Sequence, residues 1–370
     1  MLVKDIQQIL ELWAPKELAW ERDNAGLQIG SLRSSVKRVL VALDVTDGVV
    51  DEAKRLRADV IVSHHPLLFH PVRRVDEDDR VGRLLLKLAR SGIAVYAAHT
   101  NLDFAPSGVS TALAGRLGLS QVEVLAPQRG LLKKIVVFVP ASHADKVMAS
   151  MAAAGAGQIG KYEECSFRME GTGTFKGKAG SRPYVGKAGR MERVQEIRLE
   201  MVVPTWAAAR VVAAMHASHP YEEIAYDLYG LENEFPEAGA GAIGNLDRAM
   251  SLDAFLGRAR RSLGTPALRY AGDSRRRVRR VAVCGGSGSD LLPDAIRRGA
   301  DAFLTADISY HTFERADGSI ALIDAGHYET EQPIVRKVAH YLKSEVARRK
   351  ERVSVFESKR SRNPVQYHLS

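Results

Sequence analysis

Two adjacent histidines, His64 and His65, follow the short apolar run of residues 60–62 after a single serine, Ser63. A β-branched run that stops at polar side chains is typical of a buried strand, and such a strand delivers its next residues to the carboxyl edge of a sheet. Imidazole is the commonest metal ligand in proteins. Since neighbouring residues of an extended chain point to opposite sides, we expect His64 and His65 to hold one ion each of a metal pair.

Two further segments supply carboxylates for such a site. In each, a histidine and a carboxylate stand four residues apart after a strand-like run: His99 with Asp103, and His327 with Glu331. Glu329 competes with Glu331, but Glu331 is the residue that corresponds to Asp103 in an internal repeat. Nitrogen and oxygen ligands without sulfur suit several divalent metals, of which we expect two ions per chain of zinc, iron or manganese, although cobalt and nickel also fit.

The internal repeat spans both ends of the chain. Val39 aligns with Val281 at an offset of 242 residues, and His99 aligns with His327 at an offset of 228. Two matches in the same order favour two related α/β halves with an insert between them, over the chance resemblance of any two strand-helix-strand units.

The elements that must position these residues alternate between strands and helices, which predicts sheets of mostly parallel strands with the ligands at the strand ends. We expect strands at residues 36–43, 60–63, 93–98, 278–283, 302–305 and 320–325, and helices at residues 3–13, 47–56, 81–89, 290–298 and 334–347.

The insert begins where Pro127 and Gly130 interrupt the alternation. Residues 133–228 read as β-α-β-β-α-β, the ferredoxin-like order. A glycine-rich arm at residues 171–189 is expected to be a loop or a long hairpin. The arm could hold a ligand or clasp a neighbouring subunit, or it could be a mobile part of the surface without such a role. We therefore expect residues 1–126 and 240–370 to form the two halves of the core and residues 130–236 to form the insert.

Five segments occur in the order found in the GTP cyclohydrolase 1 type 2 homologue family, also called the NIF-three-like family, and the chain resembles the members that carry a ferredoxin-like (PII/CutA-like) insert. The resemblance implies a NIF-three-like core and a toroidal homohexamer with metal sites that face an internal cavity. It also implies a dinuclear site with Glu331 as the bridge and with His64, His65, Asp103 and His327 as the other ligands. The five segments are residues 23–30, 63–66, 99–103, 305–311 and 326–331.

Several residues near these ligands have more than one interpretation. His99 is the candidate general acid or base, or else it orients Asp103. Asp307, the repeat partner of His65, and His311 are expected to support the ligands, although His311 could simply pack. The loop at residues 285–289 can cradle a phosphate, but it matches neither the Walker nor the Rossmann spacing.

One motif of the insert also has two interpretations. The segment at residues 219–223, His-Pro-Tyr-Glu-Glu, resembles a motif of the related inserts and could bind a metal or a small molecule. A His-Pro pair before a strand is more often part of a turn, and we favour that reading.

Amino-acid composition limits the other classes of protein to which the chain could belong. The chain has 370 residues, is 45% hydrophobic, and shows neither an apolar run of membrane-spanning length nor the pattern of a signal peptide, so we expect a soluble cytoplasmic protein that does not enter a membrane. Cys165 and Cys284 form no CxxC pair, which argues against a thiolate zinc site. The net charge of +9 comes without a nucleic-acid motif and is read as a solvated surface.

These observations predict a metal-dependent hydrolase that acts on a small nucleotide-like or phosphorylated molecule. The family name points to GTP, but no residue specifies a guanine pocket. The alternative is a non-catalytic metal-binding or metal-handling regulatory protein. Nucleic-acid binding inside the ring of the expected hexamer is supported only by the basic net charge, and we do not expect it.

Overall fold

The structure is a computed structural model that describes residues 1–368. It has a mixed α/β fold that divides into two compact units. The core unit comprises Met1–Pro127 together with the chain from Pro236 onward, and the inserted unit comprises Gln128–Phe235. No helix among residues 1–368 is long and apolar enough to cross a membrane.

The first sheet of the core unit has the order β1-β4-β3-β2-β15. Its inner strands are parallel, as the alternation of strands and helices predicts, whereas β1 is antiparallel to β4. Buried aliphatic side chains of these strands pack against α2 and α3. The bounds are β1 Gly26–Ile29, β2 Arg38–Ala42, α2 Asp47–Leu56, β3 Val60–Ser63, α3 Arg80–Ser91, β4 Ala94–Ala97 and β15 Ser354–Glu357.

The second sheet has the order β11-β14-β13-β12-β10-β5, in which β12, β13 and β14 are parallel to one another. Helices α5 and α8 cover a core that includes Leu113, Phe255 and Val281. The bounds are α5 Val109–Leu117, β5 Ser120–Gln128, β10 Phe235–Ser251, α8 Leu252–Leu263, β11 Arg269–Ala271, β12 Arg277–Val283, α9 Leu292–Arg297, β13 Ala302–Thr305, α10 Tyr310–Ala316 and β14 Ala321–Asp324.

The remaining helices of the core unit are α1, α4, α11 and α12. Pro333 lies in the first turn of α12, where its missing N–H leaves no bond unmade. Two short helices, α4 and α11, directly follow β4 and β14 and carry candidate metal ligands. The bounds are α1 Val3–Trp13, α4 Thr100–Phe104, α11 His327–Glu331 and α12 Pro333–Arg348, with 3-10 turns at Lys16–Leu18 and Ser289–Leu291.

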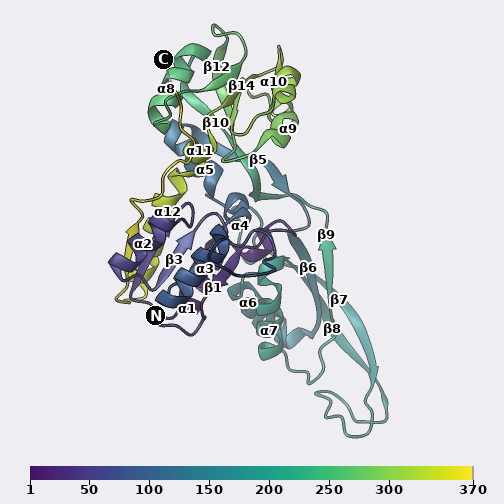
Figure 1. Cartoon of the computed structure of the whole chain (residues 1–370). Helices are drawn as coiled ribbons and strands as arrows, with labels where there is room; N and C mark the ends of the chain where they lie inside the picture. Colours follow the sequence, from purple (N-terminus) through teal and green to yellow (C-terminus); the bar gives the residue numbers. More distant parts are fainter. Residues whose placement is uncertain (369–370) are drawn as a thin grey trace. The chain divides into compact units, whose positions relative to one another are not determined.

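The inserted unit is a four-stranded antiparallel sheet, order β7-β8-β6-β9, with α6 and α7 packed on one face. Ile135, Leu199 and Met215 belong to the core between sheet and helices. Figure 1 shows the β7–β8 ribbon extending into a long loop. The bounds are β6 Leu132–Pro140, α6 Ala144–Ala153, β7 Phe167–Lys176, β8 Met191–Pro204, α7 Ala208–Ser218 and β9 Tyr226–Leu231, with 3-10 turns at Ala141–His143 and Thr205–Ala207.

The glycine-rich arm is partly a strand. Strand β7 begins at Phe167 and continues through the first glycines of the arm to Lys176. Strand β7 pairs with β8 as far as Lys176, which lies opposite Met191. Backbone hydrogen bonds therefore extend the hairpin into the arm, although the side chains of the arm show no strand-like hydrophobic pattern.

Candidate metal centre

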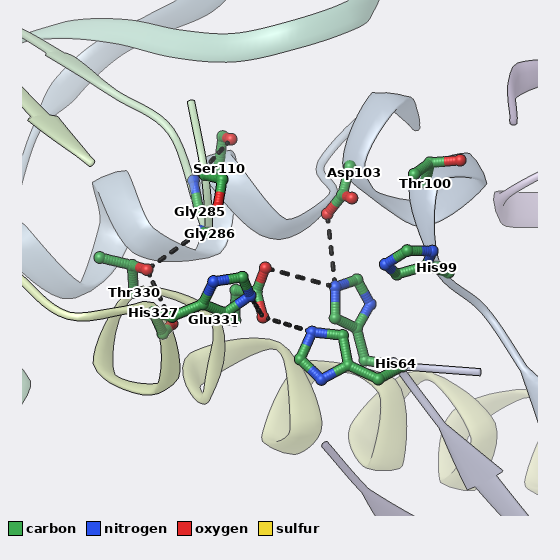
Figure 2. Close-up of polar contacts among 12 residues, drawn as sticks. His64, His99, Thr100, Asp103, Ser110, Gly285, Gly286, His327, Thr330 and Glu331 are labelled. Atoms are coloured by element: carbon green, nitrogen blue, oxygen red, sulfur yellow. Dashed lines mark hydrogen bonds and ion pairs between the residues drawn. The ribbon is translucent and has the colours of Figure 1, made fainter. Parts of the chain in front are cut away.

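The carboxyl ends of β3, β4 and β14 bring four histidines together. His64 and His65 follow β3, His99 follows β4, and His327 begins α11 after β14. Figure 2 shows His64, His327 and Glu331 directed toward one another, with His99 beside them. Ring centroids of successive neighbours lie 5.0 Å apart for His64 and His65 and 5.4 Å apart for His65 and His327.

The adjacent histidines do not point to opposite sides, contrary to our expectation. β3 ends at Ser63, and the backbone N–H groups of His64 and His65 both donate to the carbonyl oxygen of Leu43, at 3.1 and 2.9 Å. Because the chain turns at that point, strand alternation no longer applies. His64, His65 and His99 instead present nitrogen atoms that lie within 4.8 Å of one another.

Each of the four imidazoles is held through its Nδ1 atom by an oxygen atom that can accept a hydrogen bond. A carbonyl or carboxylate oxygen only accepts, so Nδ1 carries the proton and Nε2 of the neutral ring keeps a lone pair. The pairs are His64 with Ala98 O at 2.8 Å, His65 with Asp44 Oδ1 at 2.8 Å, His99 with Asp23 Oδ1 at 2.8 Å, and His327 with Asp307 Oδ2 at 2.6 Å.

The Nε2 atoms of His64, His65 and His327 converge on the carboxylate of Glu331. Oε2 lies 2.9 Å from His65 Nε2 and 3.1 Å from His327 Nε2, and Oε1 lies 3.8 Å from His64 Nε2. Asp103 Oδ1 lies 3.5 Å from His64 Nε2 (Figure 2). This convergence places lone pairs of nitrogen and oxygen against one another, which is unfavourable unless a proton or a cation lies between them.

The residues fit a divalent cation. Within residues 1–368, His64 Nε2, Asp103 Oδ1 and Glu331 Oε2 are buried and have no hydrogen-bond partner. Buried polar atoms without partners are costly, and a metal ion bound to them removes that cost. Two overlapping groups could hold an ion: His64, His65 and His99, and His65, His327 and Glu331.

Charge in the site is also arranged for a cation. The pKa of Asp103 is raised to about 6 by burial and by the nearby Glu331, although His64 opposes the shift. Burial lowers the pKa of His65, but contacts with Asp44 and Glu331 outweigh it and raise the pKa to about 10. Contact with Glu331 raises the pKa of His327 to about 9. The anionic surroundings thus stabilise positive charge at this point, which a metal ion also supplies.

Cys284 lies near the candidate metal centre but belongs to neither of the groups that could hold an ion among the described residues. Burial raises the pKa of its thiol to about 12.

The glycine-rich loop after β12 does not offer its glycine amides to a ligand. The N–H groups of Gly285, Gly286 and Gly288 donate to side-chain hydroxyls, so the loop is a poorer phosphate cradle than its composition suggests. The acceptors are Ser110 Oγ at 3.3 Å, Thr330 Oγ1 at 3.0 Å and Thr305 Oγ1 at 2.9 Å, in that order.

A cavity of about 410 Å³ opens onto the candidate metal centre. His65, His99 and Glu331 line it, together with the apolar side chains of Trp20 and Phe69. No Lys or Arg belongs to its lining in the part of the chain that the structure describes. A second cavity of about 470 Å³ also reaches His65 and His327.

The sequence profile of the Duf34/NIF3 family (NGG1p interacting factor 3) matches residues 1–364. The chain belongs to this family. The resemblance drawn from the five sequence segments is therefore confirmed.

Relatives of this NIF3-family chain align over most of its length. A protein of Halalkalibacterium halodurans named GTP cyclohydrolase 1 type 2 homolog is 44% identical over 323 residues, covering 86% of this chain and 87% of its own. A Bacillus subtilis protein of the same name is 41% identical over 366 residues and covers 98% of both chains. The crystal structure of a Bacillus cereus protein related to NIF3 matches with a TM-score of 0.89 at 40% identity, covering 100% of this chain and 99% of that one.

Not every predicted site residue of the NIF3-family chain lies in the cluster. Asp307 contacts His327, whereas the side chain of His311 is 84% exposed and contacts Glu314. Glu329 is buried and accepts a hydrogen bond from Asn363, outside the groups that could hold an ion. The structure thus distinguishes Glu331, which lies among the candidate metal ligands, from Glu329, which does not. From the sequence alone, this distinction rested only on the match of Glu331 with Asp103 in the internal repeat.

Sequence reasoning missed Asp23 as a site residue, although it lies in one of the family segments. Its side chain is 1% exposed and accepts hydrogen bonds from His99 Nδ1 at 2.8 Å and from Thr100 N at 3.0 Å. Burial raises the pKa of Asp23, but these contacts outweigh it and lower the pKa to about 2. Asp23 is therefore ionised and fixes the orientation of His99.

Proposed function

We propose that this NIF3-family protein is a metal-dependent hydrolase that acts on a small nucleotide-like molecule and holds two divalent metal ions. His64, His65, Asp103, His327 and Glu331 are the proposed ligands, with Glu331 as the bridge. The observation that carries the proposal is the orientation of the imidazoles, since each is anchored through Nδ1 and the Nε2 atoms of His64, His65 and His327 converge on the carboxylate of Glu331.

Two divalent ions, when bound, supply Lewis acidity that lowers the pKa of water toward neutrality and stabilises negative charge. His99 is the proposed general base, because its Nε2 lone pair faces the cavity while Nδ1 donates to Asp23. When His99 Nε2 takes a proton, the ionised Asp23 stabilises the resulting imidazolium. His99 then holds that proton at Nε2 for return to a leaving group.

The cavity indicates the part of the substrate that the protein itself binds. Trp20 and Phe69 offer apolar faces for a flat ring, and Asp103 and Asp290 offer hydrogen-bond acceptors. The glycine N–H groups of the loop already donate to side-chain hydroxyls, and the described lining holds no Lys or Arg, so the protein offers a phosphate group few donors here other than the histidines of the candidate metal centre. We therefore expect the base of a nucleotide, rather than its phosphates, to be bound by side chains. The name of the relatives makes GTP the first compound to test.

The test combines metal analysis with turnover. Purified protein is loaded with zinc, iron or manganese, its metal content is measured by mass spectrometry, and nucleotides, nucleosides and phosphate esters are screened for hydrolysis. We expect turnover by the wild type and by His311→Ala, whose imidazole lies in solvent, and loss of turnover in His99→Ala with metal retained. Tight metal binding with no turnover of any compound would instead favour a non-catalytic metal-handling role.

We further propose that the two core sheets come from related halves. Asp59 and Asp301, which stand 242 residues apart, each accept hydrogen bonds from two successive backbone N–H groups of the preceding strand. The strand pairing supports the same offset, since Val39 lies opposite Val60 and Val281 lies opposite Ala302. The donors are Lys37 N at 2.7 Å and Arg38 N at 2.8 Å for Asp59, and Arg279 N and Arg280 N at 2.8 Å for Asp301.

For the inserted unit we propose a ferredoxin-like domain. The chain order β6-α6-β7-β8-α7-β9 and the sheet order β7-β8-β6-β9 support it. For the assembly we propose a toroidal hexamer, on the strength of the family resemblance. Mass determination by light scattering on the full chain tests it, and a monomeric mass would contradict it.

A further inference from the structure

The inserted unit has a cavity of its own, of about 400 Å³. The glycine-rich arm lines it through residues that include Phe175 and Tyr184, and the segment that follows α7 lines it through Tyr221 and Glu223. Figure 1 shows the arm as the extension of the β7–β8 ribbon. None of these residues belongs to the metal centre.

The walls of this cavity are aromatic and acidic. Aromatic rings come from Phe138, Phe175, Tyr184 and Tyr221, and the rings of Tyr184 and Tyr221 have centroids 6.0 Å apart. Three carboxylates, those of Glu196, Glu222 and Glu223, also line it, whereas its lining within residues 1–368 includes no Lys, Arg or His. In a chain with a net charge of +9, this is a local reversal of sign.

Two of the three carboxylates already hold the walls in place. Glu196 Oε1 accepts a hydrogen bond from the hydroxyl of Tyr221 at 2.8 Å, and Glu222 Oε1 accepts one from the backbone N–H of Arg182 at 2.7 Å. Glu223 differs, since no hydrogen bond or ion pair to its carboxylate is found among the described residues. The lining therefore includes an exposed carboxylate with which no described residue is paired.

The neighbouring histidine does not make this a metal site. His219 Nδ1 accepts a hydrogen bond from the N–H of Tyr221 at 3.1 Å, and Nε2 donates to the carbonyl oxygen of Phe138 at 3.1 Å. Both ring nitrogens are thus used to form the turn before β9, which is the reading that we favoured from the sequence. Without a histidine or cysteine ligand, the cavity is poorly suited to a transition metal.

From the aromatic walls and the exposed carboxylate, we infer that this cavity binds a small organic cation, such as an ammonium or amidinium group carried on an apolar body. Aromatic faces attract cations, and a carboxylate adds a charge-assisted hydrogen bond. A guanidinium already lies over one wall from outside: the Cζ atom of Arg198 is 5.9 Å from the ring centroid of Phe138, and Arg198 is paired with Glu200. A bound ligand would use the inner faces of the other rings.

The test titrates the full metal-loaded chain by calorimetry with two pairs of probes that differ only in charge. Benzamidine is compared with benzamide, and choline with 3,3-dimethyl-1-butanol. We expect at least one cation to bind saturably and at least about tenfold more tightly than its neutral counterpart. Neutral probes that bind equally well, or no binding by either cation, would overturn the inference.

Matched variants locate the binding. Glu223→Gln and Tyr184→Ala should each weaken the cation by about fivefold or more. Glu232→Gln and Tyr162→Ala, which change an exposed carboxylate and an exposed ring of the same unit outside the cavity, should leave it unchanged. Equal binding by all four variants would place the cation elsewhere. Binding of Cu²⁺ or Zn²⁺ that is lost in Glu223→Gln, without binding of either cation, would show a metal site instead.

Discussion

Gly286 lies directly against Glu331, the carboxylate on which the imidazoles converge. A Cβ atom on Gly286 would come to 2.2 Å from Glu331 Oε1, and the residue has a φ of +64°. The glycine-rich loop therefore shapes the candidate metal centre by leaving room for its central carboxylate.

Gly286→Ala should displace Glu331 and weaken metal binding by at least about tenfold, because a contact of that length cannot be accommodated. The measurement is metal content after dialysis against a weak chelator. Gly299→Ala is the matched control, since Gly299 has a φ of +67° but no atom within 4 Å of its added Cβ. Equal metal loss in both variants would attribute the effect to backbone strain and not to Glu331.

Glu331→Gln should abolish stable binding of at least one ion, because the amide keeps the size of the side chain but loses the charge. Glu329→Gln serves as its control and should keep the metal. Elemental analysis of both proteins, purified in parallel, decides between the two carboxylates. Metal retained in Glu331→Gln and lost in Glu329→Gln would reverse the ligand assignment.

Asp23→Asn should lower turnover by about 10- to 100-fold while metal content is unchanged, because the amide cannot stabilise a protonated His99 as a carboxylate does. The double variant with His99→Ala provides the decisive comparison. If Asp23 acts through His99, the double variant is no slower than His99→Ala alone. Additive losses would show that Asp23 has a separate role.

Removal of metal should lower the melting temperature by about 2–4 °C, because a ligand present at about 100 times its dissociation constant contributes about 2.7 kcal/mol. Calorimetry of chelator-treated protein, followed by return of the metal, measures the shift. Glu331→Gln, which loses at least one ion, should show a smaller shift than the wild type. A wild-type protein that melts at the same temperature with and without metal would contradict a buried ion at the unpartnered atoms.

Much of the element pattern follows from the sequence. The periodicity of apolar residues predicts α1 and α2 with the bounds that the structure shows, and the β-branched run before His64 predicts β3. The sequence pattern did not predict the strands β1, β5, β10, β11 and β15, which lie at or next to an edge of their sheets. Strands at such positions depend on pairing with neighbouring strands, and their own side-chain pattern is weak.

The candidate site was predicted as a set of residues but not as a network. The histidines and Glu331 stand out because of their types and positions after apolar runs. Asp23 supports His99 across 76 residues of chain, and Thr330 accepts a hydrogen bond from Gly286 across 44 residues. Such contacts depend on tertiary packing, so local sequence reasoning could not assign them.

The last strand of the first sheet has a consequence for synthesis of the protein. β15 pairs in parallel with β2, with Val355 opposite Val39, although β2 leaves the ribosome long before β15 does. Until then, the far side of β2 presents unpaired backbone groups, which other chains can pair with. A chain that lacks β15 thus leaves β2 as an edge strand open to edge-to-edge aggregation, whereas in the folded chain the four-residue strand β15 covers β2 and becomes the short edge of the sheet.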